Sequence, residues 1–166
     1  MVEPLNRENG GWDIARCWLA ALEETARDFH GTQPRAFCER GYEHATQRWF
    51  RLLEEQYGIS VPKASSVKEA VENHIQVGVR AGLFRDPSQF ELTQVNPHRL
   101  ELRVIECTYR SPCQGLLDAG CTISDLTCAR IGCFRASAEM LSGVSCRYEV
   151  TGFGSDGVCD GYIEHQ

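Results

Sequence analysis

The chain has 166 residues, of which 42% are hydrophobic and 24% are charged. This length suits one domain, and the composition is that of a globular protein with a core of its own. No apolar run approaches the roughly 20 residues of a membrane span. The net charge of −6 argues against a nucleic-acid partner, because phosphate binding needs a basic surface. We therefore expect neither a membrane nor a nucleic acid as a partner.

The first half of the chain shows the apolar spacing of three helices. The first is expected over residues 12–29, with Gly31 as its C-terminal cap, and the second from Pro34 to about residue 57. A capping box at residues 66–69 opens the third, which ends near Gly82. Their inward faces are expected to carry Trp18, Leu22 and Phe29, then Tyr42 and Leu53, and finally His74 and Ile75.

The second half shows two pairs of strands with two helices between them. Residues 90–95 and 100–104 alternate apolar and polar around a turn, which predicts a hairpin. A short helix should end by Gly120, and a longer one should begin at Ser124 or Asp125 and stop at Gly143. Strands at 145–151 and 158–164 would form the last hairpin.

This order of elements predicts an α+β fold in which N-terminal helices pack on an antiparallel sheet built from two hairpins. The absence of a repeat or linker predicts a single domain over residues 1–166. Its helical part would cover about residues 12–82 and its cysteine-rich part about residues 90–164.

Seven of the nine cysteines lie in the last sixty residues. Residues 1–9 are polar and of mixed charge, without the apolar segment of a secretory signal. An odd number of cysteines also cannot pair off completely. We therefore expect reduced thiols and a cytoplasmic location. The remaining roles for these thiols are burial in the core, metal binding and nucleophilic attack.

A metal site is possible in spite of unusual spacing. No Cys-x-x-Cys motif occurs, which excludes a zinc ribbon, a thioredoxin motif and a haem attachment site. The predicted topology nevertheless lets Cys128, Glu149 and Cys159 approach one another, and thiolates with a carboxylate suit zinc. Cys146 is the preferred fourth ligand over Cys133, although an extended strand would place it and Glu149 on opposite faces. Three ligands and a water would make an open, catalytic type of zinc site.

A reactive cysteine is the other possibility. Cys107 follows a predicted strand, and Cys113 lies in the first turn of a predicted helix, where the helix N-terminus stabilises a thiolate. His74 or His98 would act as the base. The sequence by itself assembles no such dyad.

Five short motifs in the second half share the pattern of a known superfamily. They are residues 106–109 (Glu-Cys-Thr-Tyr), 128–132 (Cys-Ala-Arg-Ile-Gly), 141–144 (Leu-Ser-Gly-Val), 148–151 (Tyr-Glu-Val-Thr) and 156–159 (Asp-Gly-Val-Cys). Together they resemble the 4-vinyl-reductase domain superfamily. The first motif also resembles a segment of the related L-2-amino-thiazoline-4-carboxylic acid hydrolase family. The resemblance covers about residues 100–164.

The resemblance implies an α+β domain, often dimeric, with an apolar pocket between its layers. In zinc-bearing members the ligands come from a helical cysteine, a strand glutamate and two cysteines of the last hairpin. Cys128, Glu149 and Cys159 match three of these places. The fourth falls at Gly152, and the spacing from the glutamate to the final cysteine is one residue short.

Two functions of different classes follow. The leading hypothesis is a domain that binds or senses a small apolar or heterocyclic molecule, with Trp49, Phe84 and Phe134 in the pocket wall. The alternative is a small hydrolase acting on C–N or C–S bonds, with Cys107 or Cys113 as nucleophile and His98 as base. A third hypothesis is that the chain is a scaffold or an accessory subunit.

Overall fold

The computed structural model describes residues 10–30 and 35–166, and the α+β class is confirmed. Within these residues no helix is both long and apolar enough to cross a membrane. In chain order the elements are α1 (Gly10–His30), α2 (Arg35–Tyr57), α3 (Val67–Arg80), η1 (Pro87–Gln89), β1 (Phe90–Asn96), β2 (Arg99–Val104), α4 (Arg110–Asp118), η2 (Ile123–Asp125), α5 (Ala129–Ser142), β3 (Cys146–Phe153) and β4 (Cys159–His165).

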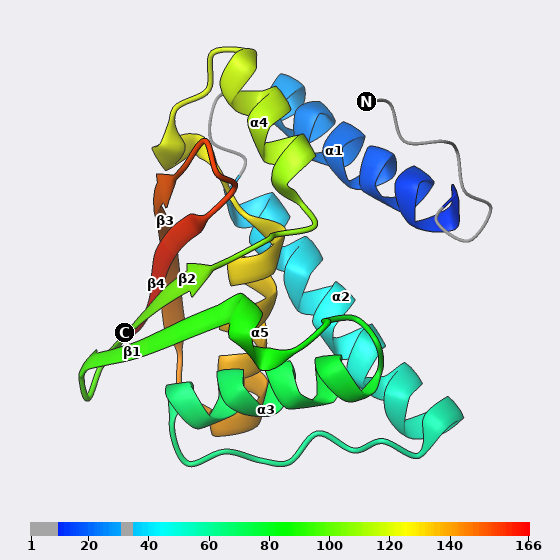
Figure 1. The fold of residues 1–166 in the computed structure, drawn as a ribbon, viewed down its shortest axis with the longest axis vertical. Helices are drawn as coiled ribbons and strands as arrows, with labels where there is room; N and C mark the ends of the chain where they lie inside the picture. The colour runs from blue at the N-terminus through cyan, green and yellow to red at the C-terminus, as the bar shows by residue number, and fades with distance from the viewer. Residues whose placement is uncertain (1–9, 31–34) are drawn as a thin grey trace.

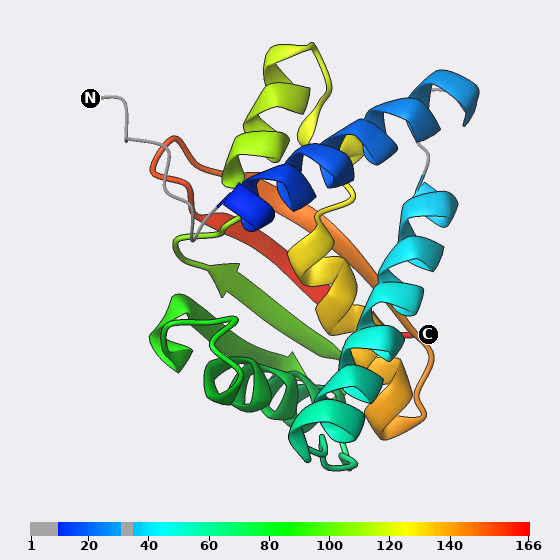
Figure 2. The same ribbon diagram turned by 90° about the vertical axis from the view of Figure 1, so that its right-hand side faces the viewer.

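The four strands form one antiparallel sheet in the order β1-β2-β4-β3. Each predicted hairpin is present, and β2 and β4 join the two hairpins at the centre of the sheet. The helices lie on one face of this sheet (Figures 1 and 2). Side chains therefore alternate between the core and the uncovered face, as in β3, where Tyr148 and Val150 are buried and Glu149 is exposed.

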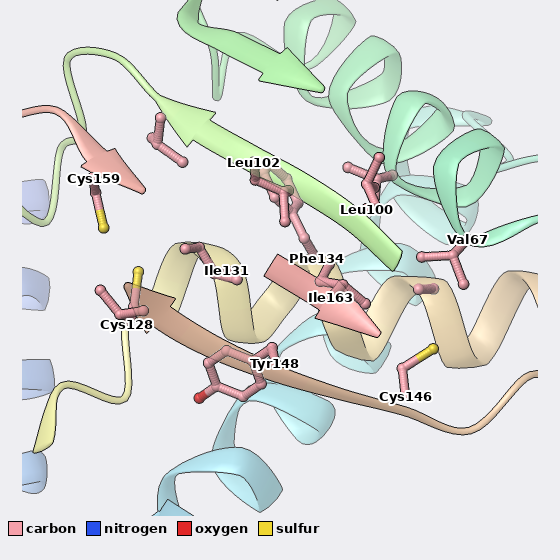
Figure 3. Packing of buried hydrophobic residues seen from close by; sticks show 14 of the residues in the cluster. Val67, Leu100, Leu102, Cys128, Ile131, Phe134, Cys146, Tyr148, Cys159 and Ile163 are labelled. Atoms are coloured by element: carbon pink, nitrogen blue, oxygen red, sulfur yellow. The ribbon is translucent and has the colours of Figure 1, made fainter. Parts of the chain in front are cut away.

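The core lies between the sheet and the helices, and α5 runs through its middle (Figure 3). Ile131, Phe134 and Ala138 of this helix are fully buried. Helices α2 and α3 pack on the side of α5 that faces away from the sheet. Ten of the 14 residues of α5 are buried.

Glycines let α5 approach its neighbours closely. A Cβ atom on Gly161 of β4 would lie 2.6 Å from the Ile131 side chain and 2.5 Å from the backbone oxygen of Glu149. On the opposite side, a Cβ atom on Gly132 would lie 2.3 Å from the ring of Tyr42 in α2. No larger residue enters either contact unless the packed elements move apart.

The predicted helix boundaries are correct except at α5. The Ser66 hydroxyl accepts from Glu69 N at 3.1 Å, and Gly143 ends α5 with a φ of 73°. However, α5 begins at Ala129 and not after Ser124 or Asp125. The Asp125 carboxylate instead accepts from Thr122 N at 2.8 Å and caps the separate turn η2. Gly31, Pro34 and residues 1–9 fall outside the described part of the chain.

The predicted inward face of α1 is mostly wrong. Trp18, Leu22 and Phe29 are 64%, 51% and 81% exposed, whereas Ala26 is buried. Among the described residues, α1 contacts α2, α4 and the segment before α5, and Trp18, Leu22 and Phe29 remain exposed outside these contacts.

A small polar junction holds α1 in place. The Tyr42 hydroxyl hydrogen-bonds to the Glu23 carboxylate and lies 2.9 Å from the Thr127 hydroxyl. One turn further on, Arg27 Nη1 donates to Cys121 Sγ at 2.9 Å. Burial raises the pKa of Glu23, which these hydrogen bonds partly offset. The junction connects α1 to α2 and to the segment that precedes α5.

The close contact at Gly161 is testable by unfolding. Gly161→Ala should lower the free energy of unfolding by about 1–3 kcal/mol, because the added methyl group overpacks the contact between α5 and the sheet. Gly41→Ala is the matched control, since nothing lies within 4 Å of the added carbon in α2. It should raise stability by about 0.5–1 kcal/mol through helix propensity. Urea unfolding curves measure both, and a Gly161→Ala protein as stable as the wild type would contradict the packing argument.

Candidate functional site

Two of the four predicted zinc ligands face each other. Cys128 precedes α5 as its N-cap and Cys159 begins β4, and their sulfur atoms point toward one another (Figure 3). Glu149 is exposed on the uncovered face of the sheet, because it alternates with the buried residues of β3. Cys146 is buried at the other end of β3, opposite His165. The structure does not bring these four residues together.

Two other cysteines join Cys128 and Cys159 instead. Cys107, in the segment after β2, and Cys113, in α4, lie close enough that each of the four thiols raises or lowers the pKa of others in the group. We call Cys107, Cys113, Cys128 and Cys159 the thiol cluster. Cys113, Cys128 and Cys159 are buried, and Cys107 is half-buried. All nine cysteines of the chain are free of disulfides.

The thiol cluster does not fit the predicted zinc ion. Among the described residues, no three or more His, Cys, Asp or Glu side chains are arranged to hold a metal. A structural zinc site needs about four ligands at one centre. Cys128 and Cys159 approach each other as a pair, and Glu149 lies across the sheet from them. The described residues therefore do not form the predicted zinc site.

Cys128 is the thiol that the site makes acidic. A hydrogen bond from the Cys159 thiol lowers the pKa of Cys128 most, and the backbone N–H groups of Ile131 and Arg130 and the charge of Arg130 lower it further. These effects outweigh burial. The hydrogen bond with Cys128, together with burial and the neighbouring thiols, raises the pKa of Cys159. Of the two thiols, Cys128 is therefore the more acidic.

The backbone at Cys128 is unusual for a residue with a side chain. Its φ is 42° and its ψ is 96°. A non-glycine residue with positive φ is uncommon and often marks a functional site. This conformation places Sγ in front of the first turn of α5, where unpaired backbone N–H groups stabilise a negative charge.

Arg130 is a buried cation between the thiol cluster and a group of aromatic rings. It is only 4% exposed. Its partners are the Thr108 hydroxyl at 3.2 Å, the rings of Phe84 at 4.4 Å and Tyr109 at 5.2 Å, and the sulfur atoms of Cys107 and Cys128. None of these partners is a carboxylate. Sequence reasoning did not single out Arg130, although its position two residues after Cys128 was a signal.

The predicted wall residues Trp49, Phe84 and Phe134 lie in one cluster of rings. Trp49 and Phe134 have ring centroids 4.9 and 5.0 Å from that of His74, and Phe84 lies 6.2 Å from Phe134. Two more rings complete this aromatic cluster, which consists of Trp49, Phe50, His74, Phe84, Phe90 and Phe134.

A small cavity lies between the aromatic cluster and the thiol cluster. Its volume is about 10 Å³, and Phe84, Phe90, Cys107 and Arg130 are among its lining residues. This is room for about one water molecule. The rings are therefore packed against one another in this structure.

The cysteine–histidine pair proposed for hydrolysis is not assembled. His98 lies in the turn before β2, with its Nδ1 3.2 Å from that of His165, whereas Cys107 lies beyond the end of the strand. Six residues of β2 separate the two by about 20 Å. Burial raises the pKa of Cys107 to about 11 and also raises that of Cys113. Both thiols are thus protonated at neutral pH.

His74 is neutral and buried in the aromatic cluster. Its Nδ1 hydrogen-bonds to Ser137 Oγ, and the Ser137 hydroxyl donates to the Cys133 carbonyl at 3.0 Å. A hydroxyl has one hydrogen, so Nδ1 is the donor to Ser137. Burial, together with the charge of Arg130, lowers the pKa of His74 to about 3. His74 thus fixes the centre of the cluster and is no base at neutral pH.

No family model and no curated protein matches the chain. Among solved structures, the phenol-responsive sensory domain of the transcription activator PoxR, crystallised with phenol, has a TM-score of 0.60 at 15% identity and covers 90% of this chain and 74% of its own. An unliganded Fe(II) H-NOX protein from K. algicida has a TM-score of 0.45 at 15% identity, covering 77% and 63%. At such identity the PoxR domain shows a shared fold, and the H-NOX similarity is too low to support an argument.

The burial of His74 predicts a pH dependence of stability. The pKa of His74 in the folded protein lies below the unfolded value of 6.5. The contribution of His74 to the free energy of unfolding is therefore complete above pH 6.5 and is lost as the pH falls toward 3. Between pH 7.5 and 5.5 this one group should remove about 1.4 kcal/mol from the free energy of unfolding. His74→Gln, which keeps a donor for Ser137, should lack this component in urea titrations.

His44→Gln is the control for that measurement, because His44 is exposed on α2 and therefore solvated before and after unfolding. It should show the same loss of stability as the wild type. If the stabilities of the wild-type protein and the His74→Gln variant had the same pH dependence, His74 would take up a proton in the folded state as readily as in the unfolded state. That result would contradict the argument from burial.

Proposed function

We propose that the chain is a small-molecule-sensing domain of the 4-vinyl-reductase type, which binds a small aromatic molecule at the aromatic cluster. The observation that carries the proposal is a set of six rings between α2, α3, α5 and the sheet, with one buried guanidinium beside them. The fold shared with the phenol-responsive PoxR domain supports it.

The chemistry of this cluster favours a ring that carries one polar substituent. Aromatic walls offer edges and faces to a ligand ring, and Arg130 offers hydrogen bonds to a hydroxyl or a carboxylate. A charged guanidinium also favours an anionic substituent such as a phenolate.

Binding at the cluster requires side chains to move, because the cavity of about 10 Å³ is far smaller than a phenol molecule. Leu83 and Phe90 line it and are only half-buried. We expect these two residues to open the pocket. A ligand then replaces ring–ring contacts with ring–ligand contacts of the same kind.

We further propose that two copies associate through α1 in the cytoplasm. Ile14, Trp18 and Leu22 are four residues apart and all more than half exposed, so they form an apolar stripe along one side of the helix. A contiguous stripe of large apolar residues on a surface marks an interaction site. A second copy would present the same stripe, as a two-fold symmetric interface requires.

Phenol is the probe for the binding site. It should raise the melting temperature in a concentration-dependent way, because a ligand that binds only the folded state stabilises it. Phe90→Leu should weaken phenol binding at least fivefold by calorimetry, since it removes a ring at the cavity. Phe153→Leu, at the end of β3, is the control and should bind like the wild type. If neither phenol nor a bicyclic phenol binds the wild-type protein at millimolar concentration, the proposal is wrong.

The α1 interface predicts a change of mass in solution. The wild-type protein should sediment as a dimer at micromolar concentration, and Trp18→Glu should sediment as a monomer, because a charge cannot be buried in an apolar stripe. Leu52→Glu, on an exposed position of α2, should leave the dimer intact. A monomeric wild-type protein would contradict this part of the proposal and leave the ligand site unaffected.

A further inference from the structure

We propose that His98 and His165 form a binding site for a divalent transition-metal ion, which joins the turn before β2 to the end of β4. The two histidines are 67 positions apart in the chain, yet their Nδ1 atoms lie 3.2 Å apart. His165 is the last residue of β4, whereas Cys159 of the thiol cluster is the first. The site is therefore separate from the thiol cluster and from the proposed ligand pocket.

The separation of the two nitrogen atoms is the first support. In zinc sites an imidazole nitrogen lies about 2.0–2.1 Å from the ion, which places two tetrahedral ligands about 3.3–3.4 Å from each other. The distance of 3.2 Å between the two Nδ1 atoms is close to this value. The ring centroids are 5.3 Å apart, so each ring directs its Nδ1 toward the other ring. An ion therefore requires only a small movement of the two side chains.

The second support is the backbone, which holds both residues in place. The His98 N–H donates to Asn96 Oδ1 at 2.8 Å, and the His98 carbonyl accepts from His165 N at 2.8 Å. The next residue, Gln166, donates its N–H to the Ser145 carbonyl at 2.9 Å. The two histidines are thus positioned before an ion arrives, which lowers the entropic cost of binding.

The charged neighbours of the two histidines point away from the site. Arg99 and Glu164 form a cross-strand pair at the adjacent position of β2 and β4. Arg99 lies over the Tyr162 ring at 3.8 Å, and Glu164 accepts from Arg147 Nε at 2.9 Å. These contacts are on the uncovered face of the sheet, because side chains alternate along a strand. No contact of Arg99 therefore brings its positive charge to the ion, and the net charge of −6 favours the approach of a cation.

The two rings share an N–H···N hydrogen bond in this structure, so one Nδ1 carries a hydrogen. Metal binding needs a lone pair on both Nδ1 atoms. A neutral imidazole has one hydrogen, and because both residues are exposed, water can carry that hydrogen to Nε2. The ion then takes the place of the shared hydrogen, and both rings stay neutral.

A pair of imidazoles selects the class of ion. Imidazole suits Zn²⁺, Ni²⁺ and Cu²⁺, whereas Mg²⁺ and Ca²⁺ prefer oxygen ligands. Within the described part of the chain, no third His, Cys, Asp or Glu joins the pair in a metal-binding group, so water fills the remaining positions, as in open sites. Because 67 positions separate the two residues, the unfolded chain does not hold them together. The ion therefore stabilises the folded state.

The experiment uses the full chain, reduced and without an affinity tag, with Ni²⁺ as the probe. Micromolar Ni²⁺ should broaden the imidazole proton NMR signals of His98 and His165, because paramagnetic nickel relaxes nearby nuclei, and should leave those of His44 on α2 sharp. It should also raise the melting temperature, and Mg²⁺ should do neither. Nickel that broadens signals around the thiol cluster and leaves both histidines sharp would overturn the proposal. This measurement needs no variant.

Two variants test the pair by calorimetry. His98→Ala and His165→Ala should each weaken nickel binding by at least about tenfold, the loss that is typical even of outer-shell partners, and should abolish the rise in melting temperature. Both residues are exposed, so neither replacement disturbs the core. His44→Ala, which also removes an exposed histidine, is the matched control and should bind nickel like the wild type. Wild-type affinity in either test variant would contradict the two-histidine site. Phenol binding is measured without metal, so the two proposals fail independently.

Discussion

The structure depends on the close packing of α5 between the sheet and the other helices. Gly161 and Gly132 leave no Cβ atoms at the two points where α5 touches β4 and α2. Because these contacts fix the position of the helix, they also fix Cys128 before its first turn, Arg130 within that turn and Phe134 one turn later. One rigid element thus places the Cys128 thiol, the Arg130 cation and the Phe134 ring of the aromatic cluster.

A second constraint is the buried charge of Arg130. A guanidinium at 4% exposure needs partners, and in this chain the Thr108 hydroxyl, two neighbouring thiols and two aromatic rings surround it. The usual solution is a carboxylate, as in the ion pairs that Arg135 makes with Glu43 and Glu139 on the same helix at 2.9 and 2.7 Å. The two buried arginines of α5 therefore have different partners: carboxylates surround Arg135, whereas a hydroxyl, thiols and aromatic rings surround Arg130.

The sequence correctly predicted those helices and strands that a capping signal or a single buried face stabilises. The strands and α3 follow from their periodicity, and the caps at Ser66 and Gly143 are correct. Trp49 and Phe134 were each predicted on the inward face of a helix, and both lie in the aromatic cluster. Phe84 lies in the segment after α3 and belonged to no such pattern. The start of α5 was not predicted, because the capping signal at Thr122 and Asp125 is satisfied by a short turn instead.

The thiol cluster could not be read from the sequence. Its four members come from a loop, two helix starts and a strand, and their distance depends on how α4 and α5 lie against β4. The alternation of β3 did give the opposite faces of Cys146 and Glu149, which already argued against the predicted zinc ligands. The periodicity of α1 identified an apolar face correctly but does not say which element, if any, covers it.

The weak attachment of α1 has a consequence for how the molecule opens. Among the described residues, this helix of 21 residues is held by the buried Ala26, the half-buried Leu19, the junction of Glu23, Tyr42 and Thr127, and the Arg27–Cys121 hydrogen bond. By contrast, β4 is paired on both sides. The free energy needed to detach α1 is therefore much smaller than that of global unfolding, and the helix forms a cooperative unit of its own. Its amide protons exchange with solvent through this local opening, while those of β4 remain protected until the whole sheet comes apart.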